Sequence, residues 1–435
     1  MRLELATFPV NEIHLGEEFR YDSGALVVDP KELLAIVRED PRIREATLAV
    51  ATPGERVRIT GIRDLVEPRI KVRGSGRIFP GILGPVQAVG DGRTHRLSGM
   101  AVMATAEYGG IIRAGTGVQR SAILDMWGPG AEISRFSSLR HLVLVLRLQP
   151  GLPELEAHTA IQRAEYKVAE RLAQITERLD PERVDTLDLT AVNPTLPRVA
   201  LIQCCLTESH HVHSGVGYYG LSIRESLATV VHPNELMDGA VTPDTTRCGR
   251  GYYPATWDWQ NHPLVFGLYA AHGKELNFSG VILERIRFET YHGKEVIAHN
   301  TARLVQAMGA GGVLITWLGG GNAFVDVMLT IQACEKLGIK TALVTYELGG
   351  KDGIDAPLLH YVPEATAIIS TGSRDRWAEL PAAEKIVGPY EEIKILSYPG
   401  APSVDPRGAL SIEARDNIIG GVDIWGGQSW MCNAY

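Results

Sequence analysis

Hydrophobic and polar positions follow two different patterns along this chain. Up to about residue 130, short apolar runs such as residues 57–62 and 70–72 alternate with Gly, Pro and Asp. Short runs bounded by turn-forming residues are typical of β-strands joined by tight connections. Residues 94–99 carry more polar side chains, which favours an edge strand. The pattern therefore predicts a β-rich N-terminal region.

Beyond residue 135 the apolar runs lengthen and alternate with helical periodicity. Residues 154–179 repeat apolar positions at helical spacing, with Ile161, Val168, Leu172 and Ile175 among them. Continuous apolar strands separated by helices are typical of a parallel, doubly wound sheet. Strands are predicted at residues 141–148, 198–206, 281–286, 313–317, 341–346 and 367–370, and further helices at 299–308 and 324–336.

The predicted fold class is α/β, with a β-rich N-terminal region followed by α/β domains with parallel sheets. We expect three regions, at residues 1–135, 136–247 and 248–435. A chain of 435 residues is long enough to give several regions their own cores. The strand predicted at 198–206 ends at a polar cluster, and open α/β sheets place their sites at such strand ends.

Composition and charge argue against several classes of protein. The 43 basic and 51 acidic residues give a net charge of −8 without a concentrated Lys/Arg run, which argues against a general nucleic-acid binder. No apolar stretch is long enough to span a membrane, and the first residues lack the apolar core of a signal peptide. Five cysteines do not suggest a disulfide framework. We therefore expect a cytoplasmic, reducing compartment.

One cysteine, Cys248, lies between the two halves in a segment rich in glycine and hydroxyl side chains. Its thiol could be a nucleophile, a metal ligand or a point of self-cleavage, because a thiolate is a strong nucleophile at modest pH. Thr245 and Thr246 could supply hydroxyls and Asp244 an acid or base, while the following glycines permit strained backbone. The alternative is a turn with a buried, unreactive cysteine.

Three histidines, His210, His211 and His213, follow Glu208 closely and come soon after two cysteines. Such a cluster could bind zinc or iron, with His232 or His262 completing the site, although the spacing matches no standard closed zinc pattern. The alternative is an active-site loop in which one histidine donates a proton near neutral pH. We favour catalysis and predict no metal.

A glycine-rich turn at residues 317–323 is predicted to follow a strand and open a helix. Backbone amides around Gly320, Gly321 and Asn322 could hold an anion there, such as a substrate carboxylate. The run lacks the dinucleotide fingerprint and the lysine of a phosphate-binding loop, so neither NAD nor ATP is predicted. A tight strand-to-helix turn without a ligand is the alternative.

Trp257, Asp258 and His262 lie shortly after Cys248 and are candidates for substrate binding. An aromatic wall could attract a substrate ammonium group by a cation–π interaction. Alternatively, these aromatic side chains pack in the interface between the two halves, where large aromatic residues commonly lie.

Residues 242–269 begin with the run Thr-Pro-Asp-Thr-Thr-Arg-Cys and continue through Tyr-Tyr-Pro-Ala-Thr-Trp-Asp-Trp-Gln-Asn-His-Pro-Leu-Val. Together with the opening Leu-Glu-Leu-Ala-Thr-Phe-Pro-Val and the Leu-Gly-Gly-Gly-Asn near residue 320, this segment resembles the proprotein subunit of component B of glycine, sarcosine and betaine reductase. The proprotein of D-proline reductase is a more distant relative. The resemblance runs along most of the chain.

In that family the precursor is cut before a cysteine, which becomes an N-terminal pyruvoyl group. The resemblance implies that Cys248 is this residue, and that chains of about 1–247 and 248–435 remain associated. An acyl shift to sulfur, β-elimination and hydrolysis would leave a ketone that forms an imine with an amino substrate. Reductive cleavage of the carbon–nitrogen bond would follow.

The resemblance also implies partners. These are a selenoprotein or Cys-containing component B subunit, a small carrier like selenoprotein A, and a small amino acid or methylated amine as substrate. We expect an oligomer and neither nucleic acid nor membrane. One alternative stays open: an uncleaved scaffold, or a substrate-binding subunit of a related reductase with a different substrate.

Overall fold

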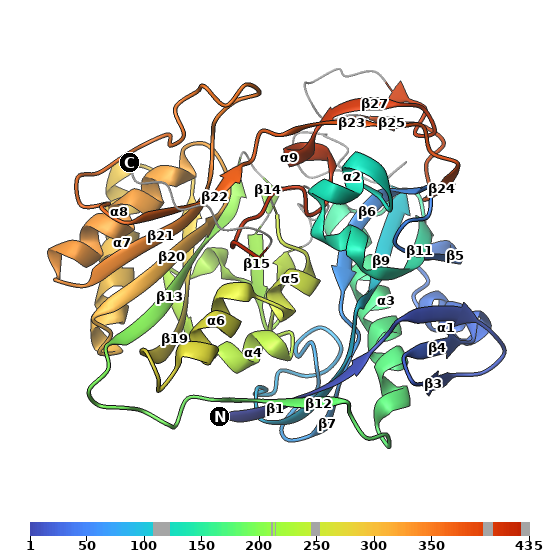
Figure 1. Ribbon diagram of the computed structural model, residues 1–435, viewed down its shortest axis with the longest axis horizontal. Coiled ribbons are helices and arrows are strands. Elements are labelled where there is room, and N and C mark those ends of the chain that lie inside the picture. The colour runs from blue at the N-terminus through green and yellow to red at the C-terminus, as the bar shows by residue number, and fades with distance from the viewer. Residues whose placement is uncertain (108–121, 210–211, 214, 245–252, 395–402, 428–435) are drawn as a thin grey trace.

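The computed structural model describes residues 1–107, 122–209, 212–213, 215–244, 253–394 and 403–427. Two halves lie side by side, each with its own sheets and core (Figure 1). The arrangement confirms the predicted fold class, a β-rich N-terminal region followed by α/β structure with a parallel sheet. No helix in these ranges is long and apolar enough to cross a membrane.

The N-terminal half is built on two main sheets. In one the strand order is β10-β6-β9-β11-β5, and in the other it is β12-β1-β8-β7. β6 and β9 are almost wholly buried because they lie inside the first sheet. The strands are β1 (Arg2–Pro9), β5 (Ile43–Ala51), β6 (Val57–Val66), β7 (Arg69–Arg73), β8 (Gly92–Ser98), β9 (Met100–Glu107), β10 (Ala122–Asp125), β11 (Arg140–Leu148) and β12 (Arg183–Asp188).

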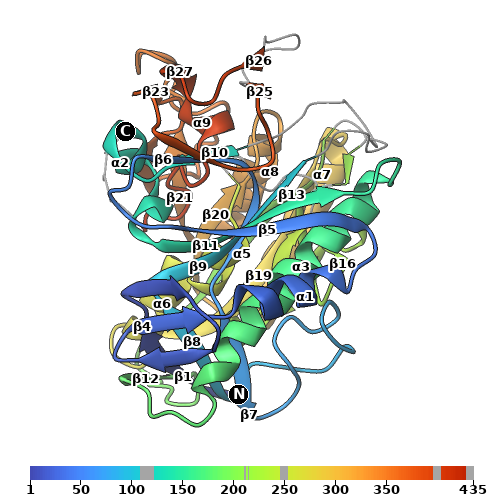
Figure 2. The ribbon, with the colours of Figure 1, turned by 90° about the vertical axis from the view of Figure 1, so that its right-hand side faces the viewer.

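One long helix and several short elements complete this half. The long helix α3 (Glu154–Ala173) packs its apolar face on the sheets and ends in a 3₁₀ turn, η2 (Gln174–Thr176), several residues before the predicted end at 179. Helix α1 packs against α3, and a small sheet of strands β2, β4 and β3 lies near α1 (Figure 2). The remaining elements are β2 (Glu12–Leu15), β3 (Arg20–Asp22), β4 (Ala25–Val28), α1 (Pro30–Arg38), α2 (Gly128–Ile133) and η1 (Arg135–Ser138).

Strand β8 is not an edge strand, so that prediction is wrong. It pairs with β1 on one side and β7 on the other. Its polar side chains are buried with partners distant in sequence: Thr94 donates to Asp238 at 2.5 Å, and His95 lies 3.1 Å from the carbonyl oxygen of Thr176. Polar residues are tolerated inside a sheet when such hydrogen bonds satisfy them.

The second half contains a doubly wound sheet with the strand order β17-β19-β13-β20-β21-β22. All neighbours are parallel except the edge strand β17. Taken along the chain, the parallel strands follow the order 2-1-3-4-5, which places the topological switch point between β13 and β20. The strands are β13 (Arg198–Ser209), β17 (Ala228–Val231), β19 (Asn277–Arg287), β20 (Gly312–Leu318), β21 (Lys340–Glu347) and β22 (Ile368–Ser373).

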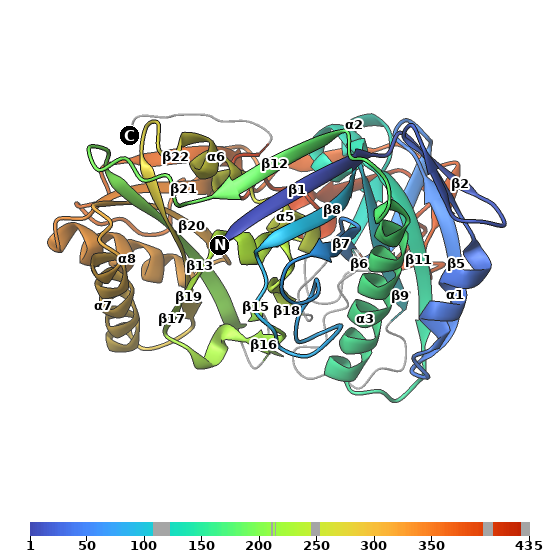
Figure 3. The same cartoon turned by 90° about the horizontal axis from the view of Figure 1, so that it is seen from below.

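Helices cover both faces of this sheet (Figure 3). The helices α7 (Tyr291–Ala307) and α8 (Ala323–Lys336) pack side by side on one face. Helix α7 begins eight residues before the predicted residue 299, with Thr290 capping its first turn. The other face meets α4 (Pro233–Met237), α5 (Thr256–Gln260) and α6 (Pro263–Ala271), and nearby lie β14 (Val212–His213), β15 (Gly215–Tyr218), β16 (Leu221–Ser222), η3 (Ile223–Glu225) and β18 (Val241–Asp244).

A C-terminal segment, residues 377–394 and 403–417, returns to the N-terminal half. Strand β24 (Lys385–Val387) pairs with β6, and the segment around it packs over β6 and β10 (Figure 2). Fully buried Arg58 fixes this segment by donating to the carbonyl oxygens of Pro381, Pro406 and Gly408. The segment contains β23 (Trp377–Leu380), β25 (Ile393–Lys394), β26 (Ser403–Val404), β27 (Leu410–Glu413) and α9 (Ala414–Asn417).

Candidate functional site

The switch point brings two of the predicted clusters to one edge of the sheet. Cys205 of β13 pairs in register with Leu318, the last residue of β20, and β13 continues to Ser209 at the same edge of the sheet. A β-carbon placed on Gly319 would lie 3.1 Å from the side chain of Leu206, so the glycine turn (residues 319–322) packs against the end of β13. Ligands of open α/β sheets bind at such an edge.

The histidine cluster lies only partly within the described residues. His210 and His211 fall outside them, while Glu208 and His213 pair in register between β13 and β14. His232 instead caps α4, where its ring accepts a hydrogen bond from the amide of Asn234 at 3.2 Å. Among the described residues, no group of three or more metal-ligating side chains could hold an ion.

The glycine turn precedes helix α8 directly. Asn322 occupies the N-cap position, and Gly321 has a φ of +61°, a left-handed conformation that favours glycine. Tyr346 fixes the turn by donating to the carbonyl oxygen of Gly319 at 2.5 Å. Arg374, which the sequence did not single out, reaches the same turn from the end of β22.

The segment around Cys248, including Thr245 and Thr246, lies outside the described residues. Its two flanks are held by one helix. Gln162 of α3 donates to the carbonyl oxygen of Pro243 at 3.4 Å, and Tyr166, one turn later, lies 2.6 Å from the hydroxyl of Thr256. Helix α3 therefore fixes the chain both before and after the predicted cleavage site.

Buried Asp64 of β6 also holds Thr256, on the far side of the predicted cleavage site. Its carboxylate accepts hydrogen bonds from the amide of Thr256 at 2.8 Å and from the hydroxyl of Thr256 at 2.5 Å. Burial raises the pKa of Asp64 to about 7. Burial also raises the pKa of neighbouring Glu165 well above its usual range. The flank is thus anchored by a buried carboxyl group that titrates near neutral pH.

We expect Asp64 to make the stability of the protein depend on pH. The folded state holds a proton up to about pH 7, whereas the unfolded carboxyl loses it near 3.8, so stability falls as pH rises between these values. Urea unfolding at pH 5 and pH 8, in a Cys248→Ala background, should show this loss relative to Asp64→Asn as about 3 kcal/mol. An unchanged difference between the two proteins across this range would contradict the assignment.

Trp257 and Asp258 lie in α5, just beyond this anchor. Asp258 caps the helix by accepting from the amide of Ala255 at 2.8 Å, and Arg135 donates to both carboxylate oxygens at 2.7 Å. Trp257 packs edge-on against Phe136, with the ring centres 5.8 Å apart. Both residues help line a cavity of about 250 Å³, together with Asn261, Asp423 and Trp425.

His262 is fully buried. It stacks on Trp425 with ring centres 3.8 Å apart, and its Nε2 lies 3.4 Å from the side-chain oxygen of Gln203. Burial lowers the pKa of His262 to about 3, so the ring is neutral at physiological pH. Trp425 belongs to the core of the second half and Gln203 to β13, so this environment suits packing better than charge recognition.

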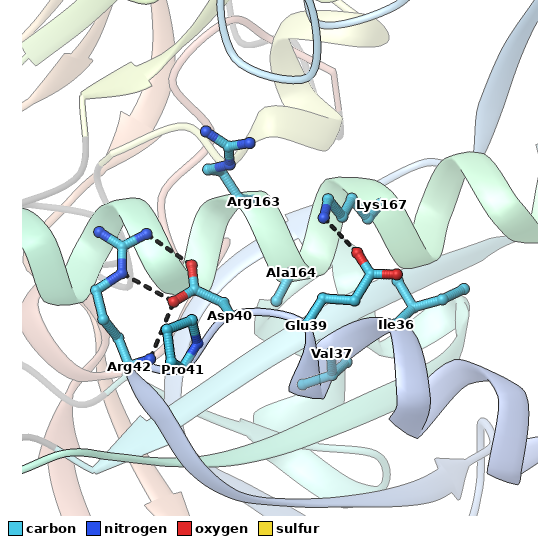
Figure 4. Close-up of a pocket in the computed structure, with 9 residues that line it drawn as sticks. All are labelled: Ile36, Val37, Glu39, Asp40, Pro41, Arg42, Arg163, Ala164 and Lys167. Carbon is cyan, nitrogen blue, oxygen red and sulfur yellow. Dashed lines mark hydrogen bonds and ion pairs between the residues drawn. The ribbon is translucent and has the colours of Figure 1, made fainter.

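A second cavity of about 250 Å³ lies between the end of α1 and α3, in the N-terminal half. Its charged side chains form two ion pairs, Asp40 with Arg42 at 2.6 Å and Glu39 with Lys167 at 2.6 Å. Arg163 points away from both pairs (Figure 4). None of its residues belongs to a predicted cluster, and we assign it no role.

Comparison with known proteins connects this geometry to a family. Residues 1–432 match the family of glycine/sarcosine/betaine reductase component B subunits. The chain is 32% identical over 415 residues to the sarcosine reductase complex component B subunit alpha of Peptoclostridium acidaminophilum, covering 93% of this chain and 94% of that protein. No solved structure matches the chain.

Two further relatives extend the comparison. The glycine reductase complex component B subunits alpha and beta of Acetoanaerobium sticklandii are 30% identical over 429 residues, with 97% of this chain and 96% of that protein covered. The betaine reductase complex component B subunit alpha of Peptoclostridium acidaminophilum is 31% identical over 430 residues, covering 96% of this chain and 95% of that protein. The chain therefore belongs to the family of glycine/sarcosine/betaine reductase component B subunits.

Proposed function

We propose that this chain is a self-processing precursor, cut between Arg247 and Cys248, and that the new N-terminus carries a pyruvoyl group for amino-acid reduction. The observation that carries the proposal is the family match along the whole chain. One relative of matching length is named for two subunits, alpha and beta, on a single chain. A single cut in the present chain would give two subunits in the same way.

The covalent steps balance without an added oxidant. The thiolate of Cys248 attacks the carbonyl carbon of Arg247, and the peptide nitrogen leaves as an amine, which gives a thioester. β-Elimination breaks the carbon–sulfur bond, so residue 247 departs as a thiocarboxylate and residue 248 becomes a dehydroalanine. Its imine tautomer adds water and releases ammonia. The remaining ketone would supply an electrophile for a small amino acid or methylated amine.

The anchors described above support this role for the chain's own residues. Gln162 holds Pro243, and Asp64 with Tyr166 holds Thr256. We propose that these contacts keep Pro243 and Thr256, on the two sides of the cut, in place before and after cleavage.

Strand order supports continued association of the two products. β13, which precedes the cut, lies between β19 and β20, which follow it. In the N-terminal half, β6, which precedes the cut, pairs with β24, which follows it. The two chains would therefore share both cores and stay together until the protein unfolds.

In this proposal the reducing group comes from a separate chain. A selenol or thiol of a component B partner would displace the amine, and a small carrier like selenoprotein A would act next. A denaturing gel of the purified protein, before and after incubation with such a partner, tests the proposal. Two fragments divided at residue 248 are expected. One full-length band throughout would instead favour an uncleaved scaffold.

We expect the histidine cluster to act in catalysis without a structural metal. Removal of a structural zinc ion usually unfolds a small metal-dependent region. Treatment with a chelator should therefore leave the thermal transition nearly unchanged, whereas single alanine substitutions of His210, His211 or His213 should slow cleavage or turnover. Stoichiometric zinc, with a large drop in melting temperature when it is removed, would assign these residues to a metal site.

A further inference from the structure

We propose that Arg374 and the glycine turn bind the carboxylate of the substrate. The inference rests on the proposed function, because it places an amino-acid substrate at the carboxyl edge of the doubly wound sheet. Arg374 follows β22 immediately, whereas the turn follows β20. Two separate strand ends would thus contribute to one site.

The position of Arg374 is fixed by its neighbours. Its backbone amide donates to the carbonyl oxygen of Glu347 at 3.0 Å, which ties it to the end of β21. Its guanidinium lies over the ring of Tyr346, with Cζ 5.7 Å from the ring centre. Tyr346 also holds the glycine turn through the carbonyl oxygen of Gly319. One aromatic side chain therefore positions both parts of the proposed site.

The guanidinium reaches the backbone of the turn. A β-carbon on Gly320 would meet Nη1 of Arg374 at 3.4 Å. The turn leads into α8, a helix of 14 residues, and the amides of Phe324 and Val325 in its first turn donate to the carbonyl oxygens of Gly321 and Asn322, each at 3.1 Å. The positive end of the helix dipole adds to the guanidinium charge. A small anion between them would meet the guanidinium on one side and the positive end of the helix dipole on the other.

The charge of Arg374 is only weakly compensated. Its side chain is 13% exposed, and the carboxylate contact that it makes among the described residues is long, with Nε 3.4 Å from Oδ1 of Asp375. Asp375 is engaged more closely elsewhere, with Arg415 at 3.0 Å and with the amide of Gly350 at 3.0 Å. Within the described ranges, the buried Nε of Arg374 has no hydrogen-bond acceptor. A largely buried cation without a full partner is costly.

A carboxylate matches this arrangement better than a phosphate group. A planar guanidinium binds a carboxylate through two parallel hydrogen bonds. The turn lacks the lysine that phosphate-binding loops add to their glycines. The switch point beside β13 also brings the turn close to the strand that leads to the histidine cluster.

Calorimetric titration of the Cys248→Ala protein tests the proposal, because binding is then measured without cleavage. The probes are glycine, betaine and acetate, with tetramethylammonium as a ligand that lacks a carboxylate. Arg374→Gln should weaken binding of all three carboxylates by roughly 10- to 100-fold, the usual effect of losing charged hydrogen bonds. Arg374→Lys should retain part of the affinity. Gly320→Ala should weaken binding as well, because its methyl group lies beside Nη1.

Arg376→Gln is the matched control, since Arg376 is exposed and only two residues away. It should bind within twofold of the parent, and every variant should keep the parent's thermal transition. Equal affinity of Arg374→Gln and parent, tight binding of tetramethylammonium, or no saturable carboxylate binding would each overturn the proposal. Uncleaved wild-type protein would refute only the processing step, because these titrations do not depend on it.

Discussion

Replacement of Cys248 by alanine should abolish cleavage and leave one full-length chain without a reactive carbonyl. The substitution removes both the nucleophile and the atoms that become the ketone. Cys248→Ser should cleave more slowly, because a hydroxyl is a weaker nucleophile at neutral pH. Denaturing gels and labelling with a hydrazine would measure both effects. Substrate turnover of the alanine variant at the wild-type rate would contradict the pyruvoyl mechanism.

Cys334→Ala provides a matched control for this experiment. Cys334 is a buried thiol in α8, on a helix that packs against the doubly wound sheet. Its loss should reduce stability slightly through a small cavity, while cleavage proceeds to two fragments. Loss of cleavage in both cysteine variants would mean that the effect reflects altered packing and not the chemistry of Cys248.

Replacement of Arg58 by methionine should lower the free energy of unfolding by about 3–5 kcal/mol, the usual result of breaking a buried ion pair. Arg58 donates to both oxygens of Asp125, at 2.7 and 2.9 Å, and neither side chain is exposed. The variant leaves Asp125 buried without its partner and frees the carbonyl oxygens of the returning C-terminal segment. Urea unfolding in the Cys248→Ala background, where the chain is continuous, would measure the change.

The ion pair of Arg56 with Glu384 offers a control in the same region. Its atoms are 2.8 Å apart, but both side chains are more than half exposed. Arg56→Met should therefore change stability by less than about 0.5 kcal/mol. The double variant Arg58→Met, Asp125→Leu should recover part of the lost stability, because no unpaired charge is left. Equal effects of the Arg56 and Arg58 substitutions would contradict this account of the returning segment.

The parallel strands of the second half could be predicted from sequence because burial on both faces leaves continuous apolar runs. The strand predicted at 198–206 corresponds to β13, and the one at 313–317 to β20, each within a few residues. Helices were harder to delimit. The first turn of α7 contains Gly293, which weakens the helical signal. Helix α1 was missed, although Asp29 and Pro30 form a recognisable start.

Residues that act through long-range contacts left little local signal. Asp64 lies in a strand that is buried throughout, and its partner Thr256 is 192 residues away in sequence. Arg374 belongs to a short charged run that resembles a solvated loop. Its place four residues after the strand predicted at 367–370 could have identified it, because the end of a parallel strand is where a binding residue is expected.

The pairing between strands on opposite sides of the predicted cut could not be predicted from sequence either. Sequence patterns identified β13 and β20 as strands, but not that β13 lies between β19 and β20, because pairing is decided by tertiary packing. The return of β24 to β6 joins residues more than 300 positions apart in the chain. These pairings make the two proposed products one folded unit.

Intact-mass spectrometry of the purified wild-type protein tests the central claim most directly. We expect two species, one that ends at Arg247 and one that begins at residue 248. The second should have the mass of a chain with an N-terminal pyruvoyl group, and borohydride should reduce it by adding two hydrogen atoms. A single species with the mass of the full chain, unchanged by borohydride and by incubation with a component B partner, would contradict the account.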